Sequence, residues 1–332
     1  MNPERGSVFE VRGSQSEVVP EHRTPNPEPR SVVVVGGANV DLIGTAPGPI
    51  SPRVSNPGRV RIGPGGAGRN VAENLARLGA CVTLLSTVDA GPLGDWLIDR
   101  TAAAGVDVTQ VARVPGRGSY YVGIQSDGVL QWGISDMAAA ESLTAAEIDP
   151  HAELIRAAAA IVVDANVPQI TIGHVAQLAS GLVCLLPVSV AKSTRVLDTL
   201  HRASLIVLTS GEAHTLTGRP AESHDQIVQA GRELQARGPA AVVITAGDRG
   251  MVWIGRDVTW ARVDPPAIAD STGAGDAVAS VAVYSMLTGI REDLAARLSA
   301  AAGAMTVGVE GATHPGLTRE ALERYAELAK SL

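Results

Sequence analysis

The seven residues Asp270-Ser-Thr-Gly-Ala-Gly-Asp276 combine an anion-binding turn with a carboxylate. Gly273 and Gly275 permit a tight turn in which consecutive backbone N–H groups point at one position. The small and apolar residues after Asp276 predict a helix, whose dipole would add positive potential there. An anion hole with a base at its edge is what phosphoryl transfer requires. Taken alone, the segment also fits a plain helix N-cap with a glycine-rich turn.

An asparagine and an aspartate follow the first predicted strand. Val32-Val-Val-Val35 is a continuous β-branched run, as in buried parallel strands. In the segment Gly36-Gly-Ala-Asn39-Val-Asp41 that comes next, Asn39 and Asp41 offer donors and acceptors suited to sugar hydroxyls. An ordinary exit from a strand into a turn explains the same residues equally well.

A glycine-rich segment, Gly63-Pro-Gly65-Gly66-Ala-Gly68-Arg69-Asn70, leads into a predicted helix. Its glycines permit close approach of a ligand to the backbone, and Asn70 would project near the helix start. Arg69 and Glu73 have the spacing of an i,i+4 ion pair, which is a simpler role for the arginine than ligand binding. In outline the segment is similar to a dinucleotide fingerprint. It does not directly follow the first strand, however, and no acidic ribose partner stands at the usual spacing.

A fourth cluster, Thr245-Ala-Gly247-Asp-Arg-Gly250, follows a predicted strand at residues 241–245. Its hydroxyl and glycines suit contact with nucleotide phosphates, and a glycine-rich hairpin is an equally good interpretation. All four clusters stand at predicted strand ends, where open α/β sheets bind ligands.

Strands and helices alternate along most of the chain. Further strands are predicted at residues 81–87, 160–163, 183–186 and 205–208, and helices at 69–78 and 94–105. The chain beyond Ala277 is predicted to be mostly helical. This alternation predicts an α/β fold with a doubly wound, mostly parallel sheet flanked by helices.

The pattern changes between Val111 and Leu130. Tyr120-Tyr-Val-Gly-Ile124, the turn Ser126-Asp-Gly128 and Val129-Leu-Gln-Trp132 predict a β-hairpin. With residues 41–43 and 59–62 it would form a small separate sheet. We therefore predict a disordered tail at 1–30 and one domain at 31–332, with this small sheet drawn from about 41–63 and 115–135.

Composition restricts the classes of partner. The 332 residues carry a net charge of −7, which argues against a nucleic-acid polymer or an anionic membrane, and no apolar run reaches transmembrane length. Residues 1–30 are rich in Pro, Glu, Arg and Ser and lack a signal core. Cys81 and Cys184 lie in apolar runs and are predicted to be buried free thiols. A reducing cytoplasm fits these features. The histidines show no metal-ligand spacing and are expected at the surface.

In this order, the four clusters resemble those of the ribokinase-like (phosphofructokinase B-type) family of sugar and nucleoside kinases. The resemblance covers about residues 31–332, and its two specific motifs are Gly65-Gly-Ala-Gly-Arg-Asn70 and Asp270–Asp276. Within the family the chain is most similar to the pseudouridine kinases, through four segments: Ser55-Asn-Pro-Gly-Arg59, Gly68-Arg-Asn70, Ser135-Asp136-Met137 and Asp164-Ala-Asn166. Where sugar-specific members often carry Lys, Ala67 would leave room for a base on the sugar.

The resemblance implies a role for each cluster. Asp276 matches the catalytic base, and Gly273, Ala274 and Gly275 match the anion hole. The acceptor is expected to contact Asn39, Asp41, Gly65, Gly66, Asn70, Ser135, Asp136 and Asp164. The nucleotide is expected to contact Thr245, Gly247, Gly250, Thr272, Gly273 and Gly275. Glu212 matches a position that binds Mg²⁺ through water, and Asp270 one associated with a monovalent cation, K⁺.

The implied activity is ATP-dependent phosphorylation of the 5′-hydroxyl of pseudouridine, with the small sheet acting as a lid and as the interface of a homodimer. Two departures from the family pattern stand out: Thr209 replaces an Asn three residues before Glu212, and Leu186 replaces an Asp before Pro187.

Three alternatives stay open at this point. They are a family kinase for ribose, fructose or adenosine, a non-catalytic regulator that binds a sugar or nucleotide, and, more distantly, a dehydrogenase.

Overall fold

The computed structural model describes residues 30–126, 129–265, 267–327 and 330–331. The predicted tail thus lies outside the described residues, apart from Arg30, whose guanidinium donates to the carbonyl of Leu287. Positions 127 and 128 of the predicted hairpin turn also lie outside them.

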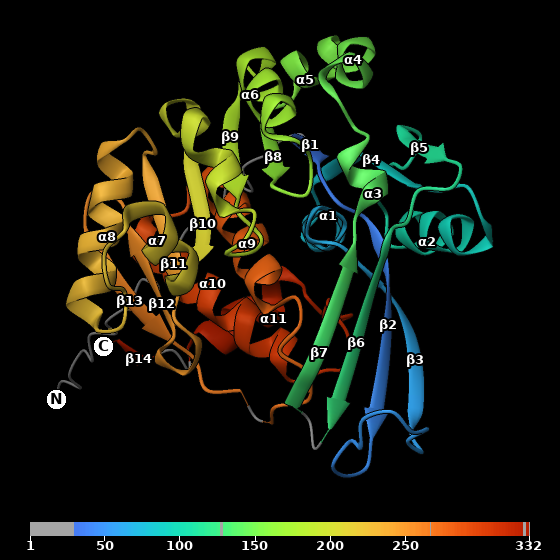
Figure 1. Cartoon of the computed structure of the whole chain (residues 1–332). Helices are drawn as coiled ribbons and strands as arrows, with labels where there is room; N and C mark the ends of the chain where they lie inside the picture. Colours follow the sequence, from blue (N-terminus) through green and yellow to red (C-terminus); the bar gives the residue numbers. More distant parts are fainter. Residues whose placement is uncertain (1–29, 127–128, 266, 328–329, 332) are drawn as a thin grey trace, which may run out of the picture.

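One large sheet forms the centre of the molecule (Figure 1). Its strands, in spatial order, are β14 (Lys330–Ser331), β13 (Val258–Arg262), β12 (Met251–Ile254), β11 (Ala241–Thr245), β10 (Leu205–Thr209), β9 (Leu182–Leu186), β8 (Ala160–Asp164), β1 (Ser31–Val35), β4 (Cys81–Asp89) and β5 (Val111–Val114). The strands from β11 to β5 are parallel, and β12, β13 and β14 are antiparallel to their neighbours.

Helices cover both faces of this sheet because its strands are apolar on both sides. In β1, Val32 and Val34 pack into one core, and Val33 and Val35 into the other. The first core is completed by α1 (Ala67–Arg77), α2 (Pro92–Ala103), α9 (Ala274–Thr288), α10 (Glu292–Val307) and α11 (Arg319–Ala326). The second is completed by α4 (Ala145–Ile148), α5 (Ala152–Ala157), α6 (Gln169–Leu178), η2 (Ser193–Arg202), α7 (Ser210–Thr217) and α8 (His224–Ala236). The predicted doubly wound α/β fold is confirmed.

A second sheet of four strands projects from one side of the body (Figure 1). We call it the lid sheet. It has the order β3 (Arg59–Gly65), β2 (Asn39–Ala46), β6 (Tyr120–Ser126) and β7 (Val129–Asp136). The pair β2–β6 is parallel, and β2–β3 and β6–β7 are antiparallel. The short helix α3 (Ala138–Glu141) follows β7.

The chain enters the lid sheet directly from β1 and returns from β3 into α1, so two of the glycine-containing clusters stand where the two sheets meet.

The sequence interpretation was wrong about one cysteine. Cys184 is buried in β9, and burial raises the pKa of its thiol, but Cys81 is exposed. Cys81 is the first residue of β4, where the strand has not yet entered the core. Both thiols are free.

Candidate active site

Helix α9 begins at the predicted anion-binding turn. Gly273 is its N-cap and adopts φ 77°. A Cβ at this position would lie 1.9 Å from the carbonyl oxygen of Ala312, so the turn excludes any larger residue. Ala274, Gly275 and Asp276 form the first turn, whose free N–H groups and dipole favour an anion.

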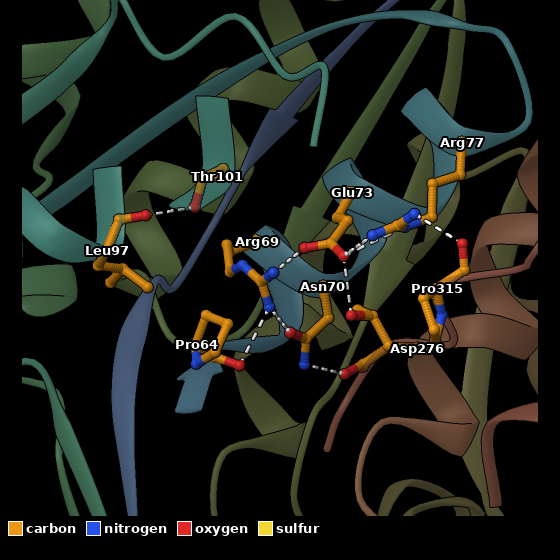
Figure 2. A network of polar contacts seen from close by, with 10 residues as sticks. Pro64, Arg69, Asn70, Glu73, Arg77, Leu97, Thr101, Asp276 and Pro315 are labelled. Atoms are coloured by element: carbon orange, nitrogen blue, oxygen red, sulfur yellow. Dashed lines mark hydrogen bonds and ion pairs between the residues drawn. The ribbon is translucent and has the colours of Figure 1, made fainter. Parts of the chain in front are cut away.

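Asp276 is a half-buried carboxylate at this helix start. Its Oδ2 accepts a hydrogen bond of 2.8 Å from Nδ2 of Asn70, which is 206 positions away in the sequence (Figure 2). Burial raises its pKa to about 7, and the charges of Asp164 and Asp41 add to the rise. The hydrogen bond from Asn70 and the charge of Arg69 oppose it. A carboxyl group with a pKa near neutrality is suited to act as a general base.

Asn39 and Asp41 lie on one face of β2 because side chains two apart in a strand point the same way. Asn39 Nδ2 donates to Asp41 Oδ1 at 2.6 Å. Burial raises the pKa of Asp41 to about 6, with Asn39, Arg69 and Arg61 lowering it. A Cβ on Gly65 would lie 2.3 Å from the Asp41 carboxylate, so this glycine lets β3 approach the acid.

Gly66 and Asp164 shape the turn between β3 and α1. Gly66 has φ 96°, and a Cβ there would meet the carbonyl oxygen of Gly37 at 2.5 Å. Asp164, at the end of β8, accepts hydrogen bonds from the backbone N–H groups of Gly37 (2.9 Å), Gly68 (2.7 Å) and Asn166 (2.8 Å). Burial raises its pKa, and these bonds oppose the rise. The Asp164 carboxylate therefore holds the backbone of both glycine-containing clusters, at Gly37 and at Gly68.

A cavity of about 100 Å³ lies beside Asp276 and is lined by Leu186, Val188, Val207, Leu208, Thr209, Glu212, Thr245, Gly275, Asp276 and Ala279. The ends of β10 and β11 and the start of α9 meet at this cavity. Val188 has φ 58°, a strained conformation for a β-branched residue that is typical of functional loops.

Thr209 and Glu212 cap α7 reciprocally. Thr209 Oγ1 accepts from Glu212 N at 3.2 Å, and Glu212 Oε2 accepts from Thr209 N at 2.7 Å. Threonine and asparagine are both favoured N-cap residues, so the departure from the family pattern keeps the local structure. Burial raises the pKa of Glu212, and its bonds to Thr209 lower it. Glu212 lines the cavity, and among the described residues a hydrogen bond is formed by its Oε2 and none by its Oε1, so the carboxylate fits a Mg²⁺-bound water.

The cluster Thr245–Gly250 joins β11 to β12 as an antiparallel hairpin with the short turn η3 (Gly247–Arg249). Gly247 has φ 62° and Gly250 has φ 88°. Thr245 lines the small cavity, so this hairpin also stands beside the anion-binding turn.

Asp270 does not offer a free carboxylate to a cation. Its Oδ2 accepts from Arg61 Nη2 at 2.9 Å and from Gly311 N at 3.3 Å, and its Oδ1 accepts from Thr272 N at 3.0 Å. Burial raises the pKa of Asp270, but these hydrogen bonds outweigh it and the pKa falls below its usual value. A guanidinium from the lid sheet already compensates the charge, so the carboxylate does not fit the K⁺ role that the resemblance implies.

The register of the lid sheet separates Ser135 from Asp136. Tyr121 pairs with Asp41 and with Ser135, so these three side chains lie on the same face of the lid sheet. We call it the inner face, because it carries Asp41. Asp136 falls on the opposite face and accepts a hydrogen bond from Ala138 N at 3.2 Å. Tyr121 was not singled out from the sequence. Only the alternation along a correctly paired hairpin could have indicated its position beside Asp41.

The chain was then compared with known proteins. The family model for pfkB family carbohydrate kinases matches residues 29–319. This chain belongs to the pfkB family. The resemblance inferred from the motifs is therefore confirmed, and a dehydrogenase is excluded.

The chain is also similar to curated nucleoside kinases. Pseudouridine kinase of Escherichia coli is 29% identical over 292 residues, which cover 86% of this chain and 93% of the relative. Guanosine-inosine kinase of Exiguobacterium acetylicum is 28% identical over 77% of this chain and 87% of its own.

Solved structures confirm the fold. Ribokinase of Arabidopsis thaliana, complexed with ribose and ATP, has a TM-score of 0.78 at 22% identity, over 90% of this chain and 99% of the ribokinase. A carbohydrate kinase from Agrobacterium tumefaciens has a TM-score of 0.77 at 28% identity and covers 91% of this chain and 100% of its own.

Two negative findings apply to the described residues of this kinase. No helix there is both long and apolar enough to cross a bilayer. In the same part of the chain, no group of three or more His, Cys, Asp and Glu side chains could hold a metal ion.

Proposed function

We propose that this kinase transfers the γ-phosphoryl group of ATP to the 5′-hydroxyl of pseudouridine. The observation that carries the chemistry is Asp276: a half-buried carboxylate, with its pKa raised to about 7, in the first turn of a helix that begins at a left-handed glycine. Base and anion hole therefore share one turn.

The choice of acceptor rests on three observations. The similarity to Escherichia coli pseudouridine kinase extends over 93% of that protein. Ala67, the first residue of α1, is small where a base would approach. Tyr121 on the inner face of the lid sheet can stack on a nucleobase, a contact of about 1–3 kcal/mol. A free sugar has no base that could stack on Tyr121.

The proposed reaction transfers one proton and one phosphoryl group. Asp276 Oδ1, which has no protein hydrogen-bond partner among the described residues, takes the proton of the acceptor hydroxyl. The hydroxyl oxygen forms a bond to the γ-phosphorus as the bond to the bridging oxygen of ADP breaks. The backbone N–H groups of residues 273–276 offset the charge on the phosphoryl oxygens, and Thr245, Gly247 and Gly250 hold the nucleotide. Mg²⁺, when bound through water to Glu212, supplies further neutralisation of the phosphates.

The test is ATP consumption with pseudouridine, uridine, ribose, fructose and adenosine side by side. We expect pseudouridine to give the highest kcat/KM and Asp276→Asn to lower its kcat by about 10²–10⁴-fold. Turnover of a free sugar without turnover of pseudouridine would overturn the acceptor but not the kinase chemistry. Binding of nucleoside without turnover would support a non-catalytic regulator.

A further inference from the structure

Arg69 is buried beside the catalytic carboxylate and does not contact it. Its residue exposure is only 1%, unusual for an arginine in the first turn of a helix. Nη1 donates to the carbonyl oxygen of Pro64 at 3.1 Å and to Oδ1 of Asn70 at 2.7 Å, and Nη2 donates to the carboxylate of Glu73 (Figure 2). The pair with Glu73 has the predicted i,i+4 spacing. The contact with Asn70 was not predicted from the sequence.

The contact with Arg69 determines which way the Asn70 amide points. A guanidinium has only donors, so the amide atom that faces it must be the oxygen. The amide nitrogen must then face Asp276, where it donates to Oδ2 at 2.8 Å. If the amide rotated by 180°, two donors would face each other at Arg69, and the amide oxygen would face the carboxylate.

We propose that Arg69 is a positioning residue that fixes the Asn70 amide, so that Asn70 holds Oδ2 of Asp276 and leaves Oδ1 for the acceptor hydroxyl. This inference rests on the proposed role of Asp276 as the base. Arg69 does not contact the base itself. It acts through the side chain of Asn70, which lies between Arg69 and Asp276.

Glu73 holds the arginine in place. Its carboxylate accepts from Arg69, from Arg77 Nη2 at 2.9 Å and from Thr313 Oγ1 at 2.9 Å. Arg77 also donates to the carbonyl oxygen of Pro315 at 2.8 Å. Hydrogen bonds therefore connect Thr313 through Glu73, Arg69 and Asn70 to Asp276. A charged side chain held in this way loses little freedom when it orients its neighbour.

Several charges besides Arg69 face Asp276. Asp41 on β2 and Asp164 on β8 disfavour its ionised form, and Glu212 on α7 lines the same cavity. Asn70 and Arg69 on α1 favour the ionised form. Loss of Arg69 would thus remove a favourable charge and release the amide that donates to the base.

A double-mutant cycle tests the proposal, with kcat measured for the acceptor that the wild type uses best. We expect Arg69→Met to lower kcat by about 10–100-fold with little change in the KM for ATP, and Arg69→Lys to restore part of the loss. In an Asn70→Ala background, Arg69→Met should change kcat by less than about threefold, because the residue it acts through is gone and only the direct effect of its charge on Asp276 remains. Arg77→Met is the matched control, since Arg77 is on the same helix and pairs with the same glutamate without touching Asn70. Equal losses of kcat in the two backgrounds would overturn the proposal.

Arg69→Met removes one of the two arginines that pair with the buried Glu73 carboxylate and can destabilise the fold. Arg69→Met/Glu73→Gln removes both charges and takes its place if thermal unfolding shows such a loss. The side-chain amide signal of Asn70, identified in ¹⁵N NMR by its absence in Asn70→Ala, gives a readout that needs no turnover. We expect it to shift in Arg69→Lys and in Asp276→Asn and to stay unchanged in Arg77→Met. An unchanged signal in Arg69→Lys would overturn the proposal, whichever acceptor the panel identifies.

Discussion

In the proposed mechanism, Asp276 has to meet two requirements that oppose each other. A base must be ionised, but its site must exclude water, and burial together with Asp41 and Asp164 disfavours the charge. Asn70 and Arg69 compensate in part, which leaves the pKa at about 7. The residue is thus close to the ideal pKa for proton transfer at neutral pH.

A pH profile follows from this balance. We expect kcat/KM for the acceptor to fall about tenfold per pH unit below pH 7, because protonated Asp276 cannot take the proton. Loss of the donor in Asn70→Ala should move this limb to higher pH. Initial rates between about pH 5.5 and 8.5 at saturating Mg-ATP measure this pH dependence. A kcat/KM that stays constant above pH 5.5 would contradict the role of Asp276 as the base.

The same raised pKa predicts that Asp276→Asn stabilises the fold. A carboxyl group whose pKa rises from 3.8 to about 7 on folding costs no stability below pH 4 and its full penalty above pH 7. Since one unit corresponds to about 1.4 kcal/mol, we expect a gain on the order of 2–4 kcal/mol at pH 8 that disappears near pH 4. Urea unfolding at both pH values measures the gain. Asp99→Asn, at an exposed position of α2, is the control that should change the free energy of unfolding little.

At the scale of the element, the start of α9 has two glycines, the N-cap Gly273 and Gly275 in the first turn, and each is glycine for a different reason. Gly273 has a positive φ and lies against the Ala312 carbonyl, whereas a Cβ on Gly275 would meet no atom within 4 Å. The first glycine is required by the fold, and the second leaves space in the cavity beside Asp276.

Alanine at each position should separate these roles. Gly273→Ala should lower the free energy of unfolding by about 2–4 kcal/mol, from the left-handed backbone and the clash together. Gly275→Ala should leave stability unchanged or up to about 1 kcal/mol higher, since alanine is the better helix former, and should lower kcat because its methyl group enters the anion hole. Thermal unfolding and initial rates of the two variants measure both effects. Similar losses of stability in the two variants would show that the second glycine is structural as well.

Local patterns were enough to predict the elements that these glycines begin. The α9 turn, the α1 helix and the lid strands follow from spacing over fewer than ten residues, which a sequence displays directly. The strands β12 and β13 were not predicted, because the alternation of strands with helices that indicates β8 to β11 stops there: β11, β12 and β13 follow one another as antiparallel strands with no α-helix between them. The Arg69–Asn70–Asp276 contacts lie beyond local reasoning, because 206 positions separate the amide from the acid and an i,i+4 pair is normally exposed.

At the scale of the whole molecule, the two faces of the lid sheet differ: one faces the candidate site and the other carries exposed apolar side chains. Its inner face carries Asp41 and Tyr121, and Arg61 connects it to Asp270 on the body. The register places the exposed apolar residues together on the outer face: Val60, Ile62, Val122, Ile124, Trp132 and Ile134. Contiguous apolar faces of this kind usually mark an interface.

We propose that a second copy of the chain covers this outer face, as the family resemblance implies, and that Ile134→Glu yields a monomer. Ile134 is 69% exposed in β7, and a buried unpaired carboxylate would outweigh the apolar contacts of the interface. Ile170→Glu is the matched control, because Ile170 is 73% exposed in α6, away from the lid sheet (Figure 1). Sedimentation velocity at micromolar concentration should show a dimer for the wild type and Ile170→Glu and a monomer for Ile134→Glu. A wild type that remains monomeric up to about 100 μM would contradict the proposal, since a dimer held by a face of this kind would have formed by then.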